Sequence, residues 1–74
     1  MKFFFRTRIG TFYIVQDPQN ARWVIFYENE SLGSYYTPSQ AAEDLAGGHT
    51  YTPSCGDTSR LGIPADIGDW ERMW

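Results

Sequence analysis

The sequence predicts a single α+β domain over residues 1–74, in which a three-stranded antiparallel sheet packs against one short helix. Two observations lead to this prediction: strand-forming segments alternate with turn-forming ones over residues 1–36, and a helix start signal follows at residue 37. A chain of 74 residues supplies one domain with a thin core. Residues 48–74 are predicted to be irregular, with room for an edge strand at 49–53 and a short helical turn at 64–69.

The first strand is predicted over residues 3–16, where aromatic and β-branched residues dominate. Phe12 and Ile14 alternate with Tyr13 and Val15, which is the period of a strand. Because Gly10 interrupts the segment, residues 3–8 are expected either to begin this strand or to form a separate arm.

The second strand is predicted over residues 22–27, after a turn that Asp17 and Pro18 open. Both of its faces are apolar, which is typical of a central strand, or of one that has a helix on one face and another segment on the other. One face carries Trp23, Ile25 and Tyr27, and the other carries Val24 and Phe26. A polar turn at 28–30 then leads to a third strand over residues 32–36.

The helix is predicted over residues 37–47. Thr37 and Gln40 have the spacing of a capping box, and Pro38 takes the first helical position, where its missing N–H has no cost. Glycines at 47 and 48 end the helix, because glycine tolerates the left-handed conformation there. The apolar stripe consists of Ala41, Ala42 and Leu45.

Aromatic residues make up 18% of the chain, or 13 side chains, which is more than so thin a core is expected to enclose. Rings left exposed are the usual anchors of protein interfaces. The charge is uneven: residues 1–22 carry four basic residues and one acidic residue, whereas residues 23–74 carry two basic and eight acidic residues. The net charge of −3 disfavours a general nucleic-acid binder.

No arrangement of residues specifies catalysis. His49, Cys55 and Asp57 could be drawn as a nucleophilic set, but their spacing does not impose the geometry that such a set needs. One cysteine and one histidine are too few for a typical zinc site, so no metal and no cofactor are expected. The single cysteine also excludes an intramolecular disulfide. Since no segment approaches about 20 apolar residues, no membrane partner is expected and a cytoplasmic location is predicted.

Over residues 8–47 the chain resembles the plant Apetala-type (ethylene-response) DNA-binding domain. The resemblance is carried, in order, by Gly10-Thr11-Phe12, Trp23, Leu32-Gly33-Ser34-Tyr35, Thr37 and Ala41-Ala42. The chain is also similar to small bacterial YegP-like domains. Both families imply three strands followed by a helix across the sheet. The Apetala-type resemblance further implies DNA reading by arginines and tryptophans on the open sheet face, which here would be Arg6, Arg8, Arg22 and Trp23.

The leading functional hypothesis is a non-catalytic interaction protein of bacterial or phage type, a regulator or inhibitor that binds another protein or a second copy of itself. Its predicted contact residues are Tyr13, Trp23, Tyr27, Tyr35, Trp70 and Trp74. The alternative is a nucleic-acid-binding domain that uses Arg6, Arg8, Arg22 and Trp23. Glu28 and Glu30 weigh against the alternative, because they would repel phosphates beside the sheet.

Overall fold

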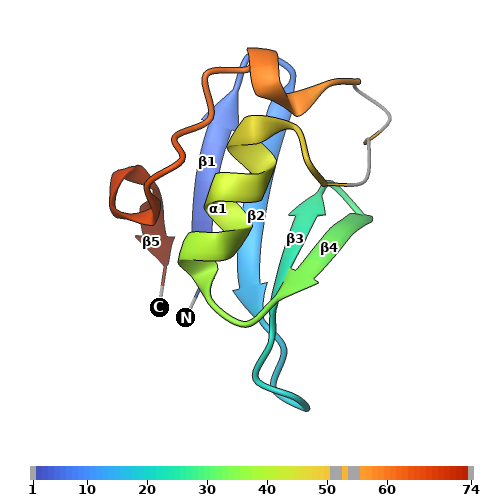
Figure 1. The fold of residues 1–74 in the computed structure, drawn as a ribbon, viewed down its shortest axis with the longest axis vertical. Coiled ribbons are helices and arrows are strands. Elements are labelled where there is room, and N and C mark those ends of the chain that lie inside the picture. Colours follow the sequence, from blue (N-terminus) through green and yellow to red (C-terminus); the bar gives the residue numbers. More distant parts are fainter. Residues whose placement is uncertain (1, 51–52, 54–55, 74) are drawn as a thin grey trace.

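The computed structural model describes residues 2–50, 53 and 56–73. It shows a five-stranded antiparallel sheet with one helix packed across it (Figure 1). The elements in chain order are β1 (Lys2–Thr7), β2 (Gly10–Gln16), β3 (Trp23–Tyr27), β4 (Glu30–Tyr35), α1 (Pro38–Gly47), the 3-10 turns η1 (Thr58–Arg60) and η2 (Ile67–Asp69), and β5 (Glu71–Met73). The α+β class is confirmed, and the number of strands is larger than predicted.

The predicted first strand is two strands, β1 and β2, which form a hairpin paired from Lys2 opposite Val15 to Thr7 opposite Gly10. Gly10 begins β2 with a φ of +146°, a conformation that residues with a side chain rarely adopt. A Cβ at this position would also lie 2.9 Å from the ring of Tyr27. Gly10 therefore lets the chain turn back next to that ring, and of the two alternatives for residues 3–8 the structure shows the separate segment, which forms its own strand β1.

The fifth strand is formed by Glu71–Met73, a segment for which the sequence predicted no strand. The strand order is β4-β3-β2-β1-β5, so the C-terminal strand β5 pairs with the N-terminal strand β1 (Figure 1). The predicted edge strand at 49–53 is not seen at the residues of that segment which the structure describes, 49, 50 and 53. The predicted helical turn at 64–69 is confirmed as η2, and it returns Trp70 to the core.

The helix agrees with its prediction in detail. The Thr37 hydroxyl accepts a hydrogen bond from the Gln40 amide at 3.1 Å, and Pro38 opens the helix. Gly48 closes it in the left-handed conformation, with φ at 76°. The stripe of Ala41, Ala42 and Leu45 is fully buried against the sheet. Small alanines at the contact let the helix lie close to the strands.

The core lies between α1 and one face of the sheet. Its largest fully buried side chains are Phe12, Ile14, Ile25 and Leu45. Thr58 of η1 is also buried, and its hydroxyl donates to the Leu45 carbonyl at 2.7 Å, which joins the irregular segment to the end of the helix. Every described element outside the sheet packs on this side.

Candidate functional site

The sheet has two chemically distinct faces, because successive side chains of a strand point in opposite directions. The face beneath α1 is buried. We call the opposite one the open face; it carries none of the described helices or 3-10 turns. Its apolar side chains come from four strands and are Phe4, Tyr13, Val15, Val24, Phe26 and Met73. The first five are half-buried and Met73 is exposed, so the face presents apolar area to solvent.

Three aromatic rings lie in one row across the centre of the open face. Phe4 is paired with Tyr13, and Tyr13 with Phe26, so the three residues occupy the same level of β1, β2 and β3. Neighbouring strands are separated by about 4.8 Å, and the row therefore spans about 10 Å. A row of directly paired rings is stabilised by cross-strand contact and is held in one arrangement.

Two cationic side chains of β1 lie beside this row of rings. The Lys2 ammonium lies 5.5 Å from the centre of the Tyr13 ring, and the Arg6 guanidinium lies 5.9 Å from the centre of the Phe4 ring. Both separations are within the range of cation–π attraction. Glu71 of β5 is paired with Phe4 and brings one negative charge to the same face. The open face thus has an apolar centre with charged groups at its β1–β5 side.

A cavity of about 200 Å³ opens on this face at the end of the β2–β3 hairpin. Its apolar walls are Val15, Val24 and Phe26 from the strands and Pro18 from the hairpin loop. Gln16 and Asp17 complete the lining. The cavity therefore continues the apolar surface into a recess instead of interrupting it.

The hairpin loop that walls the cavity is held by local hydrogen bonds. The Asp17 amide donates to the Arg22 carbonyl at 2.7 Å, and the Ala21 amide donates to the Asp17 carbonyl at 2.9 Å. The Asp17 carboxylate accepts from the Gln19 amide at 2.9 Å. These bonds hold the loop that carries Pro18, so this wall of the cavity is preformed.

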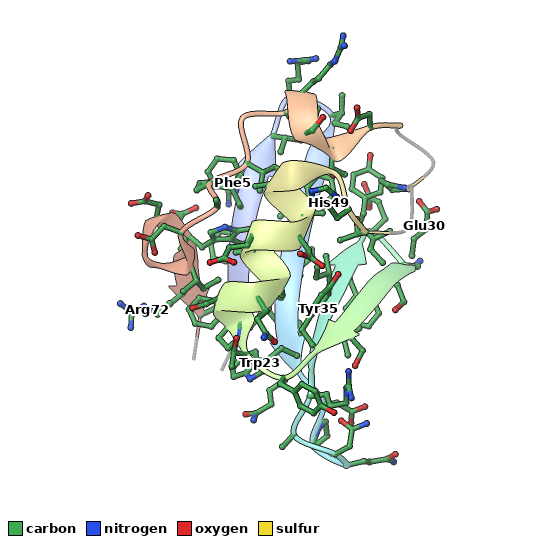
Figure 2. The ribbon with its side chains drawn as sticks, viewed as in Figure 1. Phe5, Trp23, Glu30, Tyr35, His49 and Arg72 are labelled. Atoms are coloured by element: carbon green, nitrogen blue, oxygen red, sulfur yellow. The ribbon has the colours of Figure 1, made fainter. Side chains whose placement is uncertain are left out.

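Of the predicted contact residues on β2, β3 and β4, only Tyr13 lies on the open face. Trp23, Tyr27 and Tyr35 point to the helix side, where Figure 2 shows Trp23 and Tyr35 beside α1. Because α1 covers the face that carries Trp23 and Tyr27, the predicted contact residues do not share one exposed face. Trp74 lies outside the described residues.

Tyr27 and Trp70 are structural residues of the core. Tyr27 is buried, and its hydroxyl donates to the Ile9 carbonyl at 2.7 Å. Trp70 is 4% exposed, its indole N–H donates to the Pro64 carbonyl at 2.9 Å, and its ring centre lies 5.9 Å from that of Phe5. Both were predicted as contact residues, but their side chains are buried in the core and their polar groups are hydrogen-bonded.

Tyr35 is half-buried beside the helix and is hydrogen-bonded to Asp44. Burial, followed by this bond and by the charge of Asp44, raises the pKa of Tyr35 from 10.0 to about 12. The hydroxyl therefore stays protonated and joins β4 to α1, which is a structural role.

The three arginines of the nucleic-acid alternative do not gather at one place. Arg6 lies on β1 next to the β1–β2 turn, and Arg8 is exposed in that turn. Arg22 lies at the other end of the sheet, where Trp23 pairs with Gln16. Its guanidinium donates to the Ser34 hydroxyl at 2.7 Å and to the Ser34 carbonyl at 3.0 Å. It also stacks 4.5 Å from the centre of the Tyr36 ring.

The residues considered for catalysis have ordinary local roles where the structure describes them. The Asp57 carboxylate caps η1 by accepting from the Ser59 amide at 2.9 Å, and this backbone hydrogen bond lowers the pKa of the exposed carboxyl. His49 is exposed after α1 (Figure 2), and Cys55 lies outside the described residues. Within residues 2–50, 53 and 56–73, no three His, Cys, Asp or Glu side chains are grouped to hold a metal ion.

Sequence reasoning missed Phe4, Phe26 and the cavity as candidate site features. The signal was present in the alternation, which placed Tyr13 with Val15 and Val24 with Phe26. Combining those two pairs defines the centre of the open face. The step that could not be made from the sequence was deciding which face the helix covers.

Comparisons with family models, curated proteins and solved structures found no match to this chain. The resemblance over residues 8–47 therefore stays a prediction. None of the helices in the described part of the chain has the length and apolar character needed to cross a membrane.

Proposed function

We propose that this chain is a non-catalytic domain that binds another protein through the open face of its sheet. One observation carries the proposal: apolar side chains of β1, β2 and β3 are directly paired on the face opposite α1, with the aromatic row Phe4, Tyr13 and Phe26 at its centre. Contiguous apolar surface of this kind, rimmed by polar groups, marks interaction sites in soluble proteins. Aromatic side chains at the centre of such a surface are the usual hot spots.

Charge favours a protein over a nucleic acid as the partner. Nucleic-acid affinity comes largely from neutralising phosphates. The open face offers Lys2 and Arg6 but also Glu71, while Arg22 is engaged with Ser34 and Tyr36. The chain as a whole has a net charge of −3. An apolar centre with few charges matches the composition of protein interfaces.

The test compares two variants with the same change of charge. Phe26→Lys places a cation in the centre of the open face, and Tyr36→Lys places one on an aromatic residue that is 75% exposed outside the apolar row. Both proteins are first checked for a native circular dichroism spectrum. Each is then used, with the wild-type chain, to capture proteins from an extract of the native host, and captured proteins are retested in purified form.

We expect direct binders that the wild-type chain and Tyr36→Lys retain and that Phe26→Lys loses. The proposal fails if no direct binder depends on Phe26. Sedimentation of the wild-type chain addresses self-association, because a dimer that Phe26→Lys dissociates would assign the face to a second copy. Titration with a single-stranded oligonucleotide at about 50 mM salt addresses the alternative, since electrostatic affinity is strongest at low salt.

A further inference from the structure

Resting on this proposed function, we infer that the partner segment inserts one aromatic or large aliphatic side chain into the cavity beside Val24 and presents a carboxylate to Lys2. The inference concerns the chemistry of the partner, which the apolar face alone does not specify. It is carried by the size of the cavity, its walls, and the sign of the charge next to it.

The size of the cavity matches one side chain. A cavity of about 150 Å³ lined by apolar residues accommodates a benzene molecule, and this one has about 200 Å³. Pockets for small-molecule ligands usually have about 300–1,000 Å³. The recess is therefore too small for a typical cofactor or metabolite and suits the anchor residue of a protein segment.

The walls of the cavity select an apolar anchor. Val15, Val24 and Phe26 line it from the strands, and Pro18 lines it from the loop. The carboxylate of Asp17, which also borders the recess, accepts a hydrogen bond from the Gln19 amide. Because backbone hydrogen bonds already hold this loop, the anchor enters a preformed site and little ordering entropy is lost on binding.

The charge beside the cavity selects a negative neighbour for that anchor. Lys2 is paired directly with Val15, a wall residue, and its ammonium lies over the Tyr13 ring. Arg6 follows four residues along the same strand on the same face, at about 13 Å. Glu71 of β5 is paired with Phe4 and offsets one of these two charges, so Lys2, the cation nearest the cavity, is where a carboxylate of the partner meets an opposite charge.

The experiment selects random linear peptides on the immobilised full chain and measures the affinity of the enriched sequences by fluorescence anisotropy. We expect enrichment of a Phe, Trp, Leu or Ile side chain with Asp or Glu nearby. Amide shifts in the ¹⁵N-labelled wild-type chain are expected at Val15, Val24 and Lys2 on binding. This measurement needs no variant and stays informative if a variant does not fold.

Two variants separate the two parts of the inference. Val24→Trp fills the cavity, and Lys2→Glu reverses the adjacent charge; each is expected to weaken binding by about tenfold or more, equivalent to about 1.4 kcal/mol. Tyr36→Lys is the control and is expected to bind as the wild-type chain does. Raising the salt concentration should weaken binding to the wild-type chain and should not weaken binding to Lys2→Glu, where salt screens the new repulsion.

Failure of the inference differs from failure of the proposed function. If enriched peptides lose binding with Phe26→Lys but lack acidic residues, or tolerate both Val24→Trp and Lys2→Glu, the open face binds protein and the inferred chemistry is wrong. If no peptide binds, or binding is indifferent to Phe26→Lys, the proposed function itself is contradicted.

Discussion

Replacing Trp70 with alanine should remove a large part of the stability of this domain. The side chain is 4% exposed, packs against Phe5 and donates its indole N–H to Pro64. Truncating a buried tryptophan costs about 3–5 kcal/mol. A domain of 74 residues has a total unfolding free energy of about 4–11 kcal/mol at 0.05–0.15 kcal/mol per residue. At about 4–8 °C per kcal/mol, the melting temperature should fall by more than about 10 °C.

The assay is urea unfolding followed by far-ultraviolet circular dichroism, with thermal unfolding as a second measurement. Trp70→Phe keeps the ring contact but loses the hydrogen bond to Pro64, and should cost about 1–2 kcal/mol. The control, Tyr36→Ala, removes a ring that is 75% exposed and in contact with Arg22, at a cost of about 1 kcal/mol or less. If Trp70→Ala is no more destabilising than Tyr36→Ala, the role of Trp70 as a core anchor is refuted.

Three further outcomes are expected. Gly10→Ala should cost about 1–3 kcal/mol in urea unfolding, because φ is +146° and the new Cβ would meet the Tyr27 ring at 2.9 Å. Thr58→Val should cost about 1 kcal/mol in the same assay, because it removes the buried hydrogen bond to the Leu45 carbonyl. Tyr35 should ionise near pH 12 in the folded protein, whereas the unfolded chain releases this proton at about pH 10.0. The stability that protonated Tyr35 contributes should therefore be fully present below pH 10 and should be lost as the pH rises from about 10 to about 12.

Each of these outcomes has a matched control. Gly62 has a φ of +72° with no atom within 4 Å of an added Cβ, so Gly62→Ala measures the backbone cost without the clash; equal effects at both glycines would contradict the steric argument. The control for Thr58→Val is Ser39→Ala, which removes a hydroxyl from the exposed surface of α1 and should change the unfolding free energy by less than about 0.5 kcal/mol. For Tyr35, the difference in tyrosinate absorbance between the wild-type chain and Tyr35→Phe isolates its titration, and a midpoint near 10 would contradict the effect of burial.

The local parts of the fold were predictable because their determinants are close in sequence. Thr37, Pro38 and Gly48 define α1 through contacts within a few residues of themselves, and Asp17 with Pro18 defines the hairpin turn. The division of β1 and β2 was harder to see. Phe3, Phe4 and Phe5 are all apolar, so the alternation that separates the two faces of a strand is hidden there.

The candidate site depended on a non-local choice. Periodicity groups Trp23 with Tyr27 and Val24 with Phe26, but it does not state which group lies under the helix. That choice is made by the packing of α1, which buries Tyr27 and leaves Phe26 half-exposed. The pairing of β5 with β1 joins opposite ends of the chain, and three exposed residues carry no periodic signal strong enough to predict it.

The placement of β5 has a consequence for the order in which the domain folds. Lys2 pairs with Met73, so this edge of the sheet closes a loop that spans nearly the whole chain. Loop-closure entropy opposes such a contact until intervening segments are in place. The hairpins and α1 are therefore expected to assemble first. β5 is expected to dock late, together with the packing of Trp70 against Phe5. Late docking makes this edge the first to open under native conditions, and its amides should exchange with deuterium ahead of those in β2 and β3.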